Sequence, residues 1–453
     1  MSAHIIVFPC FGQGHLLPCF ELCKHLASRT FNTTLIISSN LSSSIPSDLR
    51  RIPLIHIFEI SSSFPPPPPL SSPSPDSDPM SHHHRHQHQM ATAIESLLSS
   101  RSTSPDYVPP LCAIIDVMMS WSKGIFHKFN IPLVSFFTSG ACSAAMEYAS
   151  WKAGAFNIKP GEVLPLPGLP EDMGLDLLRP STRPSRSSWR PTWTPRFRSP
   201  TWTTRCKRST TVGSQVRGAT QTGAPATVVV EAAGSIALMI NTCDDLERPF
   251  IDTGTHPVRS STIETSDPTG NPAALRRRVI QWLDSKPRGS VLYVSFGSEV
   301  GPTMEGYAQL ALALEASNRP FIWVIQPGSG RPGPPRRPGS DSNEDSGYYP
   351  DGLEEKGVEC PFWHGQIRGD QYYDAMLVVK HLKIGYMVFA KDASETIVKE
   401  AIVDGIEKVM SDKDMKKRAE TISGKFGNGF PATSAAALDA FRDLSTKGLH
   451  KHL

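Results

Sequence analysis

Two residues in the first third of the chain have the types and positions expected of an acid–base pair. His15 ends a glycine-containing turn, Phe11-Gly12-Gln13-Gly14-His15, that follows an apolar run. Asp116 ends a second apolar run, LCAIID. A histidine titrates near neutral pH and can take the proton of a hydroxyl group as its oxygen attacks. Because a carboxylate can hold the imidazole in one tautomer and stabilise its cation, the two residues predict a site that activates a hydroxyl group.

Each of the two residues also has a purely structural interpretation. A single histidine in a turn predicts no more than a cap on the helix that follows. Asp116 at the end of a strand is also typical of a helix N-cap or an exposed acid in a loop. The choice between these interpretations depends on the elements around His15 and Asp116.

Strand–turn–helix units are predicted to position both residues. The apolar run at residues 5–9 predicts a buried strand, and Pro18 suits the first position of a helix. Cysteine and leucine side chains at 19, 22, 23 and 26 then repeat at helical spacing. Further strands are predicted at residues 34–38, 54–60, 111–116 and 131–137. Alternating strands and helices indicate parallel βαβ units, and ligands of such sheets bind at the carboxyl ends of the strands.

The segment FPCFGQGHLLPCFELCKHLA resembles the N-terminal motif of plant family 1 UDP-sugar glycosyltransferases. The resemblance implies that His15 is the catalytic base and that Gly12, Gln13 and Gly14 form the turn on the acceptor side. Asp116 and Trp121 fit the D-x-x-x-x-W context of that family's catalytic aspartate. The family relationship implies transfer of a hexose, with glucose expected, from a UDP-sugar to a hydroxyl of a small metabolite such as a flavonoid or another phenolic. It also implies inversion at the anomeric carbon, with no metal and no other cofactor.

A second strand–turn–helix unit begins at SVLYVSFGS, residues 290–298, and continues into a helical pattern and the strand PFIWVI. SVLYVSFGS also resembles the family, which implies that Gly297 and Ser298 contact the nucleotide diphosphate. A plain tight turn is the alternative. The two units together predict an α/β protein with two Rossmann-like, doubly wound domains of the GT-B type and an active site in the cleft between them.

The region after Lys356 departs from the family pattern. The donor-sugar box normally contains a Trp-Ala-Pro-Gln segment, a His-Cys-Gly-Trp-Asn-Ser segment and a glutamate that holds the ribose, and this chain has none of them. Asp370 and Gln371 match the acid–Gln pair that closes the box, which implies contacts with the sugar hydroxyls. We therefore expect weak donor binding and an incomplete C-terminal domain.

The expected domain organisation follows from these segments. An N-terminal acceptor-binding domain spans 1–255, with a low-complexity loop at 61–89 and an irregular basic insert at 179–230. A linker follows at 256–272. The remainder of the chain is a nucleotide-sugar-binding domain at 273–430, truncated near 356/357, and a C-terminal helix at 431–453.

Two biased segments have competing interpretations. The tract HHHRHQHQ is rich in metal-ligating side chains but lacks cysteine or carboxylate partners at ligand spacing, which favours a solvated loop. Arginines and tryptophans between 179 and 217 are types that bind single-stranded nucleic acid. That stretch has no apolar period, however, which favours a disordered insert or a product of altered splicing or reading frame.

Composition narrows the class of protein. A length of 453 residues predicts more than one domain, and a net charge of +3 is too small to imply nucleic acid as a partner. Eight cysteines without a C-x-x-C pair, and no stretch typical of a signal peptide or a spanning helix, predict a cytoplasmic protein. The expected partners are a UDP-sugar and a small hydroxylated acceptor. The alternative function is a catalytically impaired relative that acts as a small-molecule binding protein.

Overall fold

The computed structural model describes residues 3–61, 79–105, 107–153, 163–166, 168–176, 232–251, 258–260, 272–296, 304–325, 357–361, 370–388, 397–427 and 429–446. The expected basic insert at 179–230 lies outside these residues, and so do Gly297 and Ser298.

The larger sheet consists of seven parallel strands in the order β3-β2-β1-β4-β5-β8-β9. The strands are β1 (His4–Phe8), β2 (Asn32–Ser38), β3 (Ile55–Ile60), β4 (Cys112–Asp116), β5 (Leu133–Phe137), β8 (Ala237–Asn241) and β9 (Val258–Ser260). Every residue of β4 and β5 is buried, as expected of central parallel strands covered on both faces. Because the strand order reverses between β1 and β4, the carboxyl ends of these two strands form a topological switch point.

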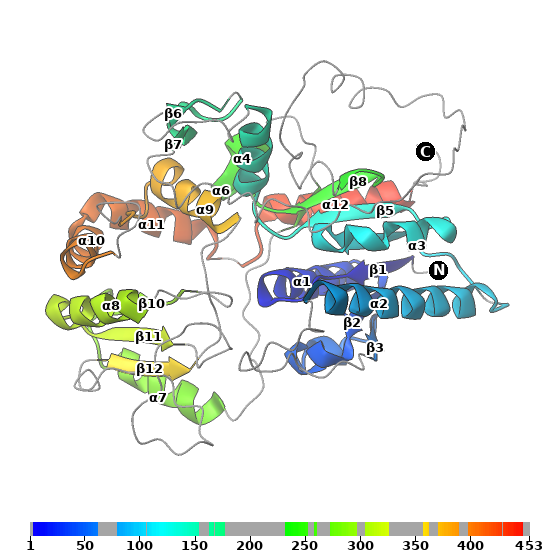
Figure 1. The fold of residues 1–453 in the computed structure, drawn as a ribbon, viewed down its shortest axis with the longest axis horizontal. Coiled ribbons are helices and arrows are strands. Elements are labelled where there is room, and N and C mark those ends of the chain that lie inside the picture. Colours follow the sequence, from blue (N-terminus) through cyan, green and yellow to red (C-terminus); the bar gives the residue numbers. More distant parts are fainter. Residues whose placement is uncertain are drawn as a thin grey trace.

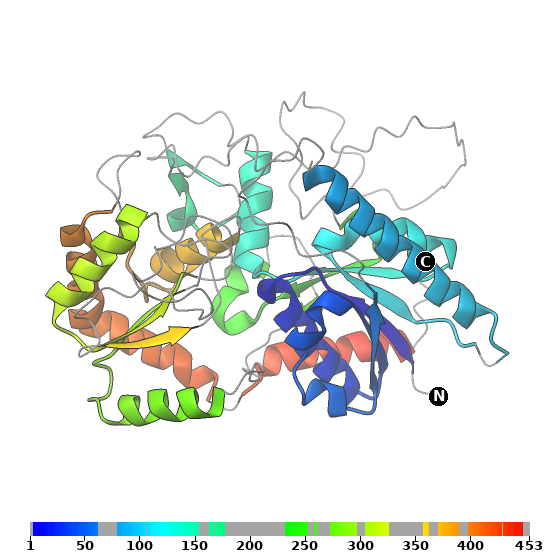
Figure 2. The same ribbon diagram turned by 60° about the horizontal axis from the view of Figure 1, so that its bottom comes forward.

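Helices cover both faces of this sheet. The helices α1 (Gln13–Ser28) and α12 (Ala432–Thr446) pack on one face, and α2 (Pro79–Ser102) and α3 (Lys123–Lys128) pack on the other (Figure 2). The structure therefore confirms a doubly wound α/β architecture for this half of the chain.

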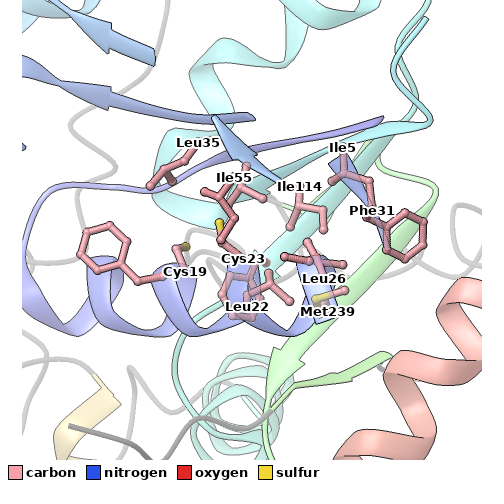
Figure 3. Close-up of a cluster of buried hydrophobic side chains, with 14 of the residues drawn as sticks. Ile5, Cys19, Leu22, Cys23, Leu26, Phe31, Leu35, Ile55, Ile114 and Met239 are labelled. Carbon is pink, nitrogen blue, oxygen red and sulfur yellow. The ribbon is translucent and has the colours of Figure 1, made fainter. Parts of the chain in front are cut away.

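The apolar side of α1 agrees with the helical spacing predicted for it. Cys19 is 1 % exposed, and Leu22, Cys23 and Leu26 are 0 % exposed. Figure 3 shows these four side chains against residues of the strands. Their strand neighbours in this cluster are Ile5, Leu35, Ile55, Ile114 and Met239.

The start of α1 differs from the prediction. The helix begins at Gln13, so Pro18 lies inside it rather than at its first position. Proline has no N–H for the carbonyl of Gly14, four residues earlier, and normally disturbs a helix interior. The helix nevertheless continues, and Pro18 itself is buried.

The smaller sheet contains three parallel strands in the order β10-β11-β12: β10 (Leu292–Val294), β11 (Phe321–Ile325) and β12 (Gly357–Pro361). The helix α8 (Met304–Ser317) packs on it and is in turn packed against α10 (Lys399–Ser411), while α7 (Pro272–Asp284) lies on the opposite side (Figure 1). Within the described residues this second domain is the smaller one. Its third strand comes directly after the expected truncation near 356/357.

Two expected segments differ from the elements that the structure describes. The helix α2 begins at Pro79, so part of the segment 61–89, expected as a loop, is helical; Met90, Ile94, Leu97 and Leu98 bury one face of that helix. The expected linker at 256–272 contains β9, which extends the first sheet. The described part of the expected C-terminal helix at 431–453 is α12, which packs on the N-terminal sheet, and residues 447–453 lie outside the described residues. Among the helices that the structure describes, none is long and apolar enough to cross a membrane.

Candidate active site

The N-terminus of α1 carries His15. Gly12 is the N-cap of the helix with φ 108°, a left-handed conformation that favours glycine. Its carbonyl oxygen accepts hydrogen bonds from the N–H groups of His15 (3.0 Å) and Leu16 (2.9 Å). His15 therefore belongs to the first turn of the helix, whereas the sequence predicted that it would end the turn before the helix. The first turn of α1 therefore sets the direction in which the His15 side chain leaves the backbone.

His15 and Asp116 form a hydrogen-bonded pair at the switch point. The distance between His15 Nδ1 and Asp116 Oδ2 is 2.8 Å. The side chain of Asp116 is 0 % exposed, whereas that of His15 is 32 % exposed. The second carboxylate oxygen, Oδ1, accepts a hydrogen bond of 2.9 Å from the Met118 N–H and caps the 3-10 helix Val117–Ser122. Oδ1 therefore makes the N-cap contact of the structural interpretation, and Oδ2 makes the contact with His15 that the functional interpretation requires.

This geometry defines the protonation pattern of the pair. An ionised carboxylate can only accept hydrogen bonds, so His15 Nδ1 carries the hydrogen and Nε2 keeps a lone pair. Burial, reinforced by the charge of Asp116, raises the pKa of the neighbouring Cys19 thiol, which therefore stays neutral. His15, partly exposed and with a buried carboxylate at Nδ1, is suited to take a proton from a ligand hydroxyl at Nε2.

Thr138 is a member of the site that the sequence did not reveal. It follows β5, and its Oγ1 lies 3.1 Å from His15 Nδ1. Its carbonyl oxygen accepts a hydrogen bond of 3.0 Å from Asn241 Nδ2, at the end of β8. The available signal was its place directly after a buried strand, because β1, β4, β5 and β8 all end at this edge of the sheet.

A buried carboxylate supports the next turn. Glu247, in α6 (Asp244–Ile251), is 5 % exposed and accepts hydrogen bonds from the N–H groups of Ala141 (3.1 Å) and Cys142 (2.9 Å) at the start of α4 (Ala141–Lys152). Thr242 Oγ1 donates a third bond of 2.5 Å. Burial raises the pKa of Glu247, and these three hydrogen bonds oppose that shift. Glu247 therefore ties the segment after Thr138 to the segment after β8.

Two large apolar side chains that are close in sequence to the pair are exposed. Phe11 and Met118 are each 54 % exposed. Phe11 precedes His15 by one turn of chain, and Met118 lies two residues after Asp116. Large exposed apolar side chains next to a polar pair are typical of a site that binds an apolar or aromatic ligand.

The expected donor-binding residues lie in a different part of the chain. Asp370 opens the helix α9 (Asp370–Met376), and the side chain of Gln371 is exposed. The helix docks on α4, where Cys142 Sγ lies 3.8 Å from the carbonyl oxygen of Tyr373. No hydrogen bond between described residues joins Gln371 to the His15–Asp116 pair. The described residues also contain no group of three or more side chains suited to a metal ion.

Comparison with known sequences identifies a consistent set of relatives. No family model matches the chain. A UDP-glycosyltransferase 73E1 from Stevia rebaudiana is 23 % identical over 417 residues, which cover 85 % of this chain and 72 % of the relative. A scopoletin glucosyltransferase from Nicotiana tabacum is 22 % identical over 477 residues, which cover 90 % of this chain and 89 % of the relative.

Comparison with solved structures gives the same fold. A UGT transferase from Siraitia grosvenorii, solved in complex with UDP, superimposes with a TM-score of 0.69 at 15 % identity and covers 98 % of this chain and 100 % of its own. A UDP-glucosyltransferase from Polygonum tinctorium gives a TM-score of 0.65 at 17 % identity, with 98 % and 99 % coverage. The two-domain GT-B fold expected from the sequence is therefore confirmed.

Proposed function

The chain belongs to the plant family 1 UDP-glycosyltransferases, and on that premise we propose that it transfers a hexose from a UDP-sugar to a hydroxyl group of a small molecule. The observation that carries the proposal is the 2.8 Å hydrogen bond between His15 and Asp116 at the switch point of the first sheet. A partly exposed base that a buried carboxylate orients is the arrangement needed to activate an acceptor hydroxyl.

The proposed reaction follows from this pair. His15 Nε2 takes the proton of the acceptor hydroxyl, and the oxygen forms a bond to the anomeric carbon of the sugar. The bond between that carbon and the diphosphate oxygen breaks, and UDP leaves with the electron pair. Attack from the face opposite the leaving group inverts the anomeric configuration. Asp116 stabilises the imidazolium that forms, so the pair itself needs no metal ion.

We propose a phenolic acceptor, such as a flavonoid, and glucose as the sugar. Exposed Phe11 and Met118 beside the pair favour an apolar, aromatic acceptor. Names of relatives agree with this proposal, among them a scopoletin glucosyltransferase and an anthocyanidin 3-O-glucosyltransferase 5. Asp370 and Gln371 remain our candidates for the sugar hydroxyls, and Gly297 and Ser298 for the diphosphate. Buried thiols such as those of Cys19 and Cys23 suit a cytoplasmic location.

A second candidate function is a small-molecule binding protein without turnover. The observation in its favour is the absence of the Trp-Ala-Pro-Gln and His-Cys-Gly-Trp-Asn-Ser segments from the sequence, since these supply most donor contacts in the family. In that case the N-terminal domain would bind the acceptor molecule without any transfer of a sugar.

Calorimetry with UDP and UDP-glucose, on the wild-type chain and on His15→Ala, separates the two functions. We expect both proteins to bind UDP. In a transfer assay with phenolic acceptors, we expect the variant to have a rate about 10²–10⁴-fold lower, the usual contribution of a general base. A folded wild-type protein that binds phenolics but neither UDP nor UDP-glucose would establish the second function instead.

A further inference from the structure

Thr138 is the second hydrogen-bond partner of the histidine nitrogen that Asp116 holds. Its Oγ1 lies 3.1 Å from His15 Nδ1, and Asp116 Oδ2 lies 2.8 Å from the same atom. We propose that Thr138 is a positioning residue for the transfer reaction, whose hydroxyl oxygen fixes the orientation of the His15 ring and stabilises the ring after it has accepted a proton. This inference rests on the proposed role of His15 as the base.

The direction of the hydrogen bond follows from the chemistry of the three groups. The hydrogen on His15 Nδ1 points to the Asp116 carboxylate, which cannot donate. Thr138 Oγ1 therefore faces the same hydrogen as an acceptor, and the contact is a three-centre bond. One acceptor leaves the ring able to turn about the axis of the bond, whereas two acceptors at the ends of different strands restrict that turn. An acceptor interacts more strongly with an imidazolium than with a neutral imidazole, because hydrogen bonds to charged groups are the stronger ones.

The surroundings hold Thr138 in place before any ligand binds. Thr138 is only 7 % exposed, and its carbonyl oxygen accepts a hydrogen bond from the Asn241 side chain. Three and four residues after Thr138, the N–H groups of Ala141 and Cys142 at the start of α4 donate hydrogen bonds to Glu247. A preorganised oxygen costs no reorganisation when charge develops on the ring, which is the condition for an effective contribution to the rate.

Asp116 from β4 is the charged group that the described contacts place against the His15 ring. Cys19 of α1 interacts with Asp116, but its raised pKa keeps the thiol neutral. Within these contacts, removal of the Thr138 hydroxyl changes hydrogen bonding at Nδ1 without changing any charge. Its effect on the titration of His15 therefore reports the hydrogen bond itself.

The test compares Thr138→Val, Thr138→Ser and the control Thr242→Val in the full-length chain. Thr242 is a buried threonine at the next strand end, 3 % exposed, whose hydroxyl binds Glu247 and not His15. The readouts are kcat, KM for UDP-glucose, and the NMR titration midpoint of the His15 ring. We expect Thr138→Val to lower kcat about 3–10-fold, the equivalent of one hydrogen bond, to move the midpoint to lower pH and to leave KM unchanged. Thr138→Ser restores kcat and midpoint, and Thr242→Val leaves the midpoint where it is.

Two results would overturn the proposal. An unchanged kcat and midpoint with a raised KM for UDP-glucose would make Thr138 a donor contact. An equal loss of kcat in Thr138→Val and Thr242→Val, with unmoved midpoints, would reduce its role to packing. If the valine variant does not fold, Thr138→Cys takes its place, since sulfur is only a weak acceptor. A wild-type chain without transfer activity would refute the proposed function, while the NMR titration would still decide whether Thr138 acts on His15.

Discussion

Asp116 combines a structural and a proposed chemical role in one side chain. Its Oδ1 caps the 3-10 helix that follows β4, and its Oδ2 binds His15. Truncation of this residue removes both contacts at once and cannot separate stability from chemistry. A substitution that keeps the cap and alters only the second contact is therefore the informative one.

Asp116→Asn is that substitution. Asparagine is as good an N-cap as aspartate, so we expect a free energy of unfolding within about 1 kcal/mol of wild type. The amide can donate to His15 Nδ1 and favour the wrong tautomer, which in an analogous catalytic arrangement costs about 10⁴-fold in kcat. Urea denaturation and a transfer assay measure the two effects. Transfer within tenfold of wild type would contradict the role of Asp116 as the partner of the base.

At the scale of the elements, the loops at the carboxyl edge of the first sheet are tied together in pairs. Asn241 after β8 binds the carbonyl of Thr138 after β5, and Glu247 binds the first N–H groups of α4. Gly140, the N-cap of α4, allows this approach because a Cβ at that position would lie 2.3 Å from Glu247 Oε1. The φ of Gly140 is −73°, which any residue can adopt. Glycine is therefore required at this position only because a side chain would not fit beside Glu247.

Gly140→Ala tests the coupling between α4 and α6. We expect it to lower the free energy of unfolding by about 1–3 kcal/mol, because the buried carboxylate must move. Gly124→Ala is the matched control, since a Cβ there meets nothing within 4 Å and a helical alanine is favoured over glycine. Equal urea midpoints for the two variants would show that Glu247 adapts without cost.

At the scale of the whole molecule, the end of the chain returns to its beginning. The helix α12, red in Figure 2, lies against the N-terminal sheet, where Leu438 is 0 % and Phe441 is 4 % exposed. Arg29 at the end of α1 also reaches Asp439, at 2.8 Å. The stability of the first domain therefore depends on residues that follow the second.

Phe441→Ala measures this dependence. Large-to-alanine changes in a core cost about 3–5 kcal/mol, and we expect a loss in this range for the first domain. Val409→Ala on α10 is the control, since Val409 is 43 % exposed. Urea denaturation measures the free energy of unfolding of both variants. A loss below about 1 kcal/mol for Phe441→Ala would show that α12 contributes little to the core.

Two half-buried histidines predict that the fold is sensitive to acid. Burial, with a contribution from nearby arginines, lowers the pKa of His4 and of His25 from 6.5 to about 4. His25 lies against Phe430, with ring centroids 3.8 Å apart, where the chain enters α12. The unfolded chain binds these protons at higher pH than the folded one, so this contribution to stability is complete above about pH 6.5 and is lost as the pH falls toward 4.

The acid dependence is measured from urea midpoints between pH 7.5 and 4.5. We expect His25→Gln to reduce the loss of stability over this range, because the variant has one fewer group to protonate on unfolding. His88→Gln, at an exposed position of α2, serves as the control and should keep the wild-type dependence. Identical pH dependence in all three proteins would contradict the assignment to His25.

Local patterns in the sequence were sufficient for the elements of the first domain. Period and apolarity predicted β1, β4, β5 and the buried face of α1, because these strands are covered on both sides and the helix on one. The start of α2 was missed, since a histidine-rich first half hides the period that begins at Met90. Pro18 was predicted at the start of a helix because proline is normally tolerated there. Its position inside α1 depends on packing, which the local sequence does not show.

The sequence by itself determined the edge of the sheet at which His15 and Asp116 lie, because each follows a strand and parallel strands end at one edge. Only the tertiary structure decided which groups meet there. Thr138 lies 123 residues from His15, and Glu247 lies 105 residues from Cys142, so no local pattern links either pair. Hydrogen bonds of this kind depend on strand order and on distances of a few ångströms, which are fixed only when the strands pair and the helices pack over them.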